Sequence, residues 1–123
     1  MSKHAFVHIE ISAIDLAATG KFYTDLFGWD VQHMPEMNYT TFETGSGVGG
    51  GFNPVNENMP AGITTVYVET EDIDATLAKA EKLGGKTVVP KTEIPGMGWF
   101  ALFSDLTGNK IGLFTALQGQ PSE

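Results

Sequence analysis

A histidine and a glutamate stand two positions apart near the start of the chain, at His8 and Glu10. They belong to the alternating segment of residues 6–11, whose pattern is typical of a half-buried β-strand. Side chains two apart in a strand leave the same face, with Cα atoms about 6.6 Å apart. Such a pair can act as general acid and base, or can supply two ligands to a divalent metal. His8 and Glu10 are therefore the candidate catalytic residues.

A second motif, the glycine-rich segment of residues 45–50, matches the GxGxxG pattern of dinucleotide-binding loops. That pattern binds a pyrophosphate where a helix begins immediately after it. The following residues, 51–56, contain Gly51, Asn53, Pro54 and Asn56 and do not favour the start of a helix. The glycines instead predict a tight hairpin and a strand with little side-chain bulk, and no nucleotide cofactor is expected.

The elements that must position His8 and Glu10 occur twice along the chain. A strand, a helix and three strands are predicted over residues 5–55, and the same order returns over residues 62–117. Each helix follows an aspartate, Asp15 or Asp72, which suits the N-cap position. A βαβββ module alone would expose an apolar sheet face, so two modules must pack together. The sequence predicts one α+β domain over residues 1–123, with a curved mixed sheet and a concave cleft.

Aromatic residues accompany the candidate pair. Strand parity predicts that four of them share the cleft face with His8 and Glu10, and that a fifth covers the opening. The four are Phe6, Phe52, Tyr67 and Phe114, and the fifth is Trp99. Gly50 and Gly112 are expected to leave open space, and residues 92–99 to form a mobile flap. Such a surface suits a small planar ligand, although the same rings could simply fill the interface between the modules.

Composition and charge restrict the partners. The chain of 123 residues is 41% hydrophobic and 18% charged and has no cysteine, as in an ordinary globular protein without disulfides. Fifteen acidic and seven basic residues give a net charge of −8, which opposes binding to nucleic acid or anionic lipid. No apolar run approaches the roughly 20 residues of a membrane span. We expect a cytoplasmic monomer or homodimer that binds a small molecule.

Several motifs resemble those of the vicinal oxygen chelate superfamily, which includes glyoxalase I, extradiol dioxygenases, fosfomycin-resistance enzymes and bleomycin-binding proteins. The resemblance covers about residues 5–117 and includes the duplicated module. The motifs are His8-Ile-Glu10, Asp15 with Lys21-Phe-Tyr23, Leu26-Phe-Gly-Trp29, Asp72-Ile-Asp74, Leu83-Gly-Gly85 and Asp105-Leu-Thr-Gly-Asn-Lys-Ile-Gly-Leu113.

The resemblance also implies where a metal would bind. Metal-binding members use four ligands, one on the first strand and one on the last strand of each module. The corresponding positions here are His8, Thr65, about Gly50, and Gly112. Only His8 keeps a side chain that binds transition metals well. The resemblance therefore implies no full metal site, and leaves a divalent metal held by His8 and Glu10 as the reduced alternative.

Three functions follow from the residues and the resemblance together. The first is a metal-free protein that binds a small aromatic or hydrophobic molecule, with His8 and Glu10 as polar anchors. The second is a glyoxalase-like lyase, isomerase or dioxygenase that uses His8 and Glu10. The third is a non-enzymatic interaction protein whose cleft is closed by packing or dimerisation.

Overall fold

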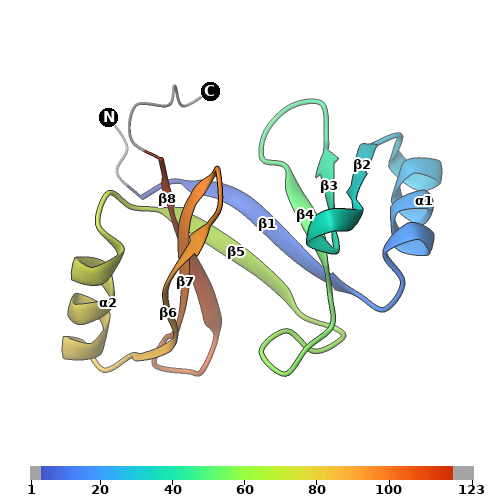
Figure 1. The fold of residues 1–123 in the computed structure, drawn as a ribbon. Coiled ribbons are helices and arrows are strands. Elements are labelled where there is room, and N and C mark those ends of the chain that lie inside the picture. Colours follow the sequence, from blue (N-terminus) through green and yellow to red (C-terminus); the bar gives the residue numbers. More distant parts are fainter. Residues whose placement is uncertain (1–3, 118–123) are drawn as a thin grey trace. The chain divides into compact units, whose positions relative to one another are not determined.

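The computed structural model describes residues 4–117, and these form two successive βαβββ repeats (Figure 1). The first repeat consists of β1 (Phe6–Ala13), α1 (Leu16–Phe27), β2 (Asp30–Met34), the short 3₁₀ helix η1 (Pro35–Met37), β3 (Tyr39–Glu43) and β4 (Gly50–Pro54). The second consists of β5 (Thr64–Glu69), α2 (Ile73–Lys82), β6 (Lys86–Ile94), β7 (Gly98–Ser104) and β8 (Lys110–Ala116). The predicted α+β fold class and its internal repeat are confirmed. Within residues 4–117, neither helix has the length and apolar character that a membrane span requires.

Close contacts divide the chain into two compact units. The N-terminal unit comprises Val7–Val66, and the C-terminal unit comprises the segment from Tyr67 onward together with the residues up to Phe6. Both boundaries fall inside strands, in β1 and β5. Two contacts attach the start of the described chain to β5: the Glu69 N–H donates to the Ala5 carbonyl at 2.9 Å, and His4 Nδ1 lies 3.0 Å from the Glu69 carbonyl.

In the N-terminal unit the strand order is β2-β3-β4-β1, with β1 and β4 parallel and the other pairs antiparallel. Asp15 caps α1 by accepting a hydrogen bond from the Ala18 N–H at 3.0 Å, and Gly28 ends the helix in the left-handed conformation. The buried face of the sheet carries Phe42 and Phe52, and Tyr23 of α1 stacks on Phe52. This aromatic core holds α1 against one face only.

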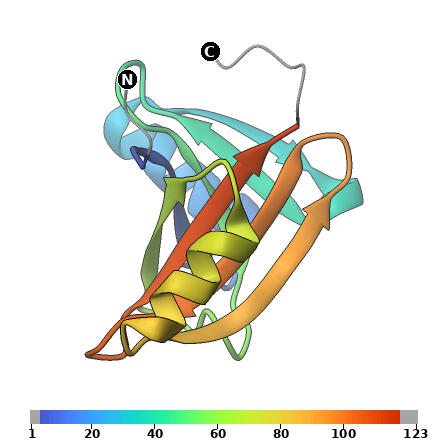
Figure 2. The ribbon, with the colours of Figure 1, turned by 90° about the vertical axis from the view of Figure 1, so that its left-hand side faces the viewer.

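The C-terminal unit repeats this plan with strand order β5-β8-β7-β6 and a parallel β5–β8 pair. Figure 2 shows α2 lying across one face of these strands. Its core is formed by Ile73 and Leu77 of α2 with Ala101 and Leu113 of the sheet. As in the first unit, the helix covers one face and leaves the other uncovered by a helix of the same unit.

The segment of residues 92–99 is part of a β-hairpin, so its prediction as a loop-like flap is wrong. Glu93 pairs with Trp99 and Ile94 with Gly98, and the hairpin turns between them. The glycines on either side of Met97 both have positive φ angles, of 77° at Gly96 and 146° at Gly98. They serve the turn and the close approach of strands, because a Cβ at Gly98 would overlap the Thr115 carbonyl.

The turn between β7 and β8 is organised by one aspartate. The Oδ1 atom of Asp105 accepts the backbone N–H groups of Thr107, Gly108 and Asn109, at 2.9 to 3.0 Å. The side-chain amide of Asn109 donates to Oδ2 at 3.1 Å. These bonds, the Asn109 side chain first, hold the pKa of Asp105 below its usual value. These bonds together build the turn of residues 105–109.

Candidate functional site

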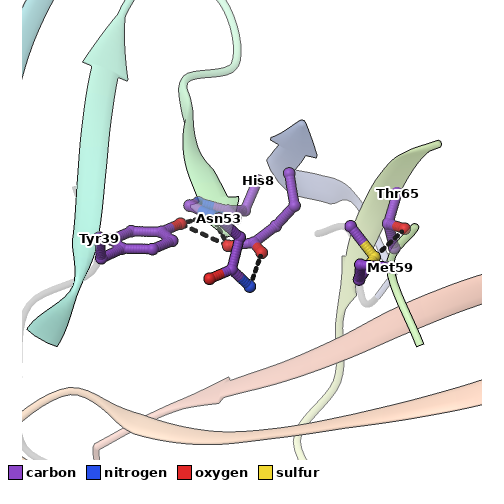
Figure 3. A network of polar contacts seen from close by, with 6 residues as sticks. His8, Tyr39, Asn53, Met59 and Thr65 are labelled. Carbon is purple, nitrogen blue, oxygen red and sulfur yellow. Dashed lines mark hydrogen bonds and ion pairs between the residues drawn. The ribbon is translucent and has the colours of Figure 1, made fainter. Parts of the chain in front are cut away.

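Four polar side chains from three strands of the N-terminal unit meet on one face of its sheet (Figure 3). They are His8 and Glu10 of β1, Tyr39 of β3 and Asn53 of β4, and we call them the polar cluster. The register shows which face this is: Ile11 pairs with Phe52, and both pack towards α1. Glu10 and Asn53 alternate with them, so the polar cluster lies on the face turned away from α1.

The carboxylate of Glu10 is the centre of the polar cluster. Glu10 is only 6% exposed, yet its two oxygens receive three hydrogen bonds. Tyr39 Oη donates to Oε2, Asn53 Nδ2 donates to Oε1 at 3.0 Å, and His8 Nε2 lies 3.1 Å from Oε2. Within residues 4–117, no buried side-chain nitrogen or oxygen lacks a hydrogen-bond partner. A buried carboxylate is therefore held in one orientation by the side chains of His8, Tyr39 and Asn53.

The donor and acceptor roles assign the protons in this network. Since the Tyr39 hydroxyl gives its proton to Glu10, its oxygen accepts from His8 Nε2, which lies 2.7 Å away. His8 is then protonated at Nε2, and this single N–H is shared between the nearer Tyr39 oxygen and Glu10 Oε2. The imidazole, the phenol and the carboxylate form a continuous path along which a proton can move. The prediction that His8 and Glu10 share one face of the strand is confirmed, and their catalytic role stays a prediction.

The ring of Tyr39 lies directly over the backbone of Gly51. A Cβ atom at position 51 would overlap the hydroxyl oxygen and Cζ of Tyr39 and would lie 2.7 Å from Cε2. The C-terminal unit shows the same arrangement with different strands: a Cβ at Gly112 would overlap the ring of Tyr67 and lie 2.7 Å from its Cγ. In both units a glycine on the last strand of the repeat makes room for a tyrosine ring.

The strand register corrects the predicted place of Phe52. Because Ile11 pairs with Phe52 and Glu10 with Gly51, the side chain of Phe52 points to α1 and not to the side of Glu10. It is completely buried in the aromatic core. The prediction that Phe52 lines the same face as His8 and Glu10 is wrong, because Gly51, and not Phe52, pairs with Glu10.

The same register also corrects one of the four positions at which metal-binding members of the superfamily carry a ligand. Glu10 and Tyr67 each precede their capping aspartate by five residues, and they pair with Gly51 and Gly112 respectively. Gly51, not Gly50, is thus the counterpart of Gly112. The expected open space at Gly50 and Gly112 is also wrong. A Cβ at Gly50 would overlap the Ile9 carbonyl, and the space over Gly112 is occupied by Tyr67.

Trp99 likewise lies elsewhere than predicted. It packs against the core beneath α2, and Lys91 Nζ lies 5.1 Å from the centre of its ring. The prediction that it covers an opening is wrong. Phe114 has the parity of Tyr67 and faces Phe100 across the β7–β8 pair, on the side away from α2.

The other aromatic residues predicted to contact a ligand differ in exposure. Phe6 is 61% exposed at the start of β1, and Tyr67 is 9% exposed over Gly112. A ligand-binding role for Phe6, Tyr67 and Phe114 stays a prediction.

The side chains at the positions compared with metal-binding proteins do not fit a divalent metal. Thr65 is 1% exposed, and its hydroxyl donates to the sulfur of Met59 at 2.9 Å (Figure 3). Gly51 and Gly112 offer no ligand and lie under tyrosine rings. Across residues 4–117, no three His, Cys, Asp or Glu side chains come close enough together to hold a metal ion. His8 and Glu10 are bonded to each other and to Tyr39 instead.

Sequence reasoning did not find Tyr39 or Asn53. Asn53 has a signal that could have identified it, since shifting β4 by one residue places it on the face of Glu10. Tyr39 has no local signal. It is separated from Glu10 by 29 residues and reaches it only because β3 pairs with β4 and β4 with β1.

Comparisons with known proteins agree with this architecture. The family model described as bleomycin resistance protein-like N-terminal matches residues 5–45. The anthracycline biosynthesis protein DnrV of Streptomyces peucetius is 31% identical over 117 residues, covering 80% of this chain and 42% of that protein. A glyoxylase-like domain-containing protein of Didymella fabae is 30% identical over 115 residues, covering 87% and 90%. The chain thus spans less than half the length of the first curated relatives it matches.

The solved structures include a glyoxalase/bleomycin resistance protein/dioxygenase superfamily member from Vibrio splendidus 12B01. It has a TM-score of 0.67 and 12% identity, with 92% of this chain and 99% of that chain covered. At this identity the likeness concerns the fold alone, and it agrees with the duplicated βαβββ plan.

Proposed function

Because the chain belongs to the glyoxalase/bleomycin resistance/dioxygenase superfamily, also called the vicinal oxygen chelate superfamily, we propose that it binds a small aromatic or hydrophobic molecule without a full metal site. The observation that carries this proposal is the polar cluster. A buried carboxylate with three side-chain donors fixes the groups that a ligand would meet, and fixed polar groups lower the ordering cost of binding.

Two rings of the polar cluster provide a flat surface for such a ligand. The imidazole of His8 and the phenol of Tyr39 are nearly parallel, with an angle of 19° and ring centres 6.4 Å apart. The side chain of His8 is 32% exposed, whereas that of Glu10 is 8% exposed. We assign ligand contact to His8 and its orientation to Glu10. A planar molecule gains stacking and hydrogen bonding at such a surface.

The charge of the N-terminal unit narrows the ligand to a neutral or cationic molecule. Residues 7–66 contain seven acidic side chains, one lysine and no arginine. The lysine, Lys21, lies on α1 and pairs with Asp25 at 2.6 Å. Phosphate and carboxylate groups are usually bound by arginine or lysine, and this unit offers neither beside the polar cluster.

The name of one relative agrees with a small organic ligand. DnrV is described as an anthracycline biosynthesis protein, and this chain matches 42% of its length. We extend to this chain only the class of ligand. We further propose that the protein acts in the cytoplasm as a monomer or homodimer.

Ligand-dependent melting of the chelator-treated full chain tests the proposal. Neutral, cationic and anionic aromatic compounds are screened against the wild type, against His8→Ala, and against His33→Ala as matched control. His33 lies in the same unit but bonds Thr40, whose side chain is on the face towards α1. A compound at 100 times its Kd adds about 2.7 kcal/mol of stability. We expect a shift that His8→Ala loses and His33→Ala keeps.

Two results would contradict the proposal. One is the absence of any melting shift across the panel, which would favour a non-enzymatic interaction protein. The other is a stoichiometric metal in the protein purified without chelator, lost in His8→Ala, which would favour a metal-dependent enzyme.

A lyase or isomerase is the second candidate, and one observation favours it. The continuous hydrogen-bonded path from His8 through Tyr39 to Glu10 can move a proton to or from a bound molecule. The test is exchange of a ligand C–H with D₂O, followed by NMR, for each compound found in the melting screen. Exchange that Glu10→Gln abolishes while binding remains would support an enzyme. Binding without exchange would leave the binding protein as the function.

A further inference from the structure

The disagreement between the side chains and a metal site has a structural cause in the N-terminal unit. The room that a side chain at position 51 would need is filled by the ring of Tyr39. A carboxylate at position 51 and the phenol of Tyr39 therefore exclude each other. The glycine is not merely a lost ligand, since it is the condition for placing Tyr39.

The Tyr39 hydroxyl contacts both members of the predicted pair. It donates to Glu10 Oε2 and lies 2.7 Å from His8 Nε2, while His8 and Glu10 are 3.1 Å apart. A metal ion bound to a histidine and a carboxylate would fix the same two groups through one central atom. We propose that Tyr39, placed by Gly51, organises His8 and Glu10 in the position that a metal ion would otherwise occupy. This proposal rests on the site of the proposed function and makes Tyr39 its positioning residue.

The C-terminal unit provides an internal control. Its tyrosine also lies on a glycine, but Tyr67 belongs to β5, the strand that corresponds to β1, and it stands where the first unit has Glu10. The packing of a tyrosine ring on a glycine thus occurs in both repeats. In the first repeat the tyrosine hydroxyl is also hydrogen-bonded to a histidine and a carboxylate. Substitution of Gly112 tests the packing without removing a member of the polar cluster.

The experiment reads the imidazole of His8 directly, by long-range ¹H–¹⁵N NMR of the labelled full chain near pH 8. The variants are Tyr39→Phe, which keeps the ring over Gly51 and removes the hydroxyl, and Gly51→Ala, which displaces the ring. Gly112→Ala is the matched control. The wild type is also titrated with one equivalent of Zn²⁺, and binding of a compound from the melting screen is measured in parallel.

We expect a single Nε2–H tautomer for His8 in the wild type and in Gly112→Ala, and a mixture of tautomers in Tyr39→Phe and Gly51→Ala. One equivalent of Zn²⁺ should leave the His8 signals in place. Ligand affinity should fall about tenfold or more in Tyr39→Phe, as for loss of a hydrogen bond to a charged network. If Gly51→Ala does not fold, Tyr39→Phe alone decides the result.

The proposal is overturned if Tyr39→Phe keeps the wild-type His8 signals, or if stoichiometric Zn²⁺ shifts those of the wild type. Failure of the proposed function gives a different result. In that case no compound binds, while the tautomer of His8 still depends on Tyr39. That outcome would support the structural role of Tyr39 and reject the ligand.

Discussion

At the scale of single residues, the molecule depends on a carboxylate that is almost fully removed from water. Glu10 is tolerated at 6% exposure because His8, Tyr39 and Asn53 supply hydrogen-bond donors to it. Removing a partner of such a group is strongly destabilising, because a buried charge or donor is then left unpaired. Substitutions in the polar cluster should therefore lower stability as well as function.

Glu10→Gln should lower the free energy of unfolding by about 1–3 kcal/mol, because its NH₂ would replace one carboxylate oxygen and face the donors that now meet that oxygen, Tyr39 and His8 at Oε2 or Asn53 at Oε1. Urea unfolding measures the change. Glu43→Gln is the control, since Glu43 is exposed on β3 and should change stability by less than about 0.5 kcal/mol. Equal effects for the two variants would contradict the description of Glu10.

Phe52→Ala tests the corrected place of Phe52. The side chain is completely buried against Phe42 and Tyr23, so its loss should cost about 3–5 kcal/mol. Phe22→Ala, on the exposed side of α1, should cost less than about 1 kcal/mol. Thermal unfolding of both variants measures this difference. A stable Phe52→Ala protein with weakened ligand binding would restore Phe52 to the site.

Some residues of the site could be predicted from their neighbours in the sequence, whereas others depend on how distant strands pair. His8 and Glu10 could be predicted together because two-residue spacing in one strand fixes a shared face. Asn53 depends on the register between β1 and β4, and Phe52 was wrongly placed for the same reason. Tyr39 depends on two successive strand pairings. A one-residue error in register turns every side chain to the other face, and no local pattern reveals it.

At the scale of elements, the two helices are set by similar signals. Asp15 and Asp72 each accept a hydrogen bond from the backbone N–H three residues later, at 3.0 Å. The predicted helices at these positions are confirmed because capping and apolar spacing are local properties. The prediction of a flap at residues 92–99 is wrong because this segment contains the end of β6 and the start of β7, and these two strands pair with each other.

Asp15→Ala and Asp72→Ala should each lower stability by about 0.5–2 kcal/mol, through loss of the N-cap acceptor. Asparagine at either position should keep most of the stability, since its side-chain oxygen accepts the same bond. Chemical denaturation of the four variants measures the comparison. If alanine and asparagine behave alike, the caps do not stabilise the helices.

The turn of residues 105–109 should make a pH-dependent contribution to stability. The pKa of Asp105 is lowered in the folded chain, mainly by the Asn109 side chain. A lowered pKa means that this contribution is complete above the unfolded pKa of about 3.8 and is lost as the pH falls through the folded pKa. The wild type should therefore lose its advantage over Asp105→Asn in acid.

Thermal melts of the wild type and Asp105→Asn measure this loss between about pH 2 and pH 7, a range that spans the usual pKa of aspartate. Asn109→Ala removes the largest cause of the lowered pKa of Asp105. In that variant, the stability that Asp105 contributes should depend less on pH. A difference between wild type and Asp105→Asn that stays constant down to the lowest pH would contradict the assignment.

At the scale of the whole molecule, charge is the property most easily tested. The chain carries a net charge of −8 and has lysine as its only basic residue type besides histidine. We expect a cationic aromatic ligand to bind more tightly than its carboxylated analogue. The ratio of the two Kd values should shrink as salt rises from about 0.01 to 0.15 M, where the Debye length falls from about 30 to 8 Å. Calorimetry at both salt concentrations measures it, and tighter binding of the anion would contradict the proposed ligand class.

The duplicated plan of the molecule could be predicted from sequence, but the boundaries of its two compact units could not. Helix periods, strand alternation and capping aspartates repeat along the chain and so identify two modules. The unit boundaries lie inside β1 and β5, where no change of composition marks them. They depend on which strands pair with each other, and no local pattern in the sequence specifies this.

The assignment of His4 and Ala5 to the C-terminal unit has a consequence for biosynthesis. The N-terminal unit is in effect inserted into the other unit, between Phe6 and Tyr67. During translation the inserted unit is complete once residue 66 has left the ribosome. The partner of Ala5, the Glu69 backbone, emerges only afterwards, and β6 to β8 later still. His4 and Ala5, which emerge before the inserted unit, therefore reach their partner on β5 only after that unit has emerged.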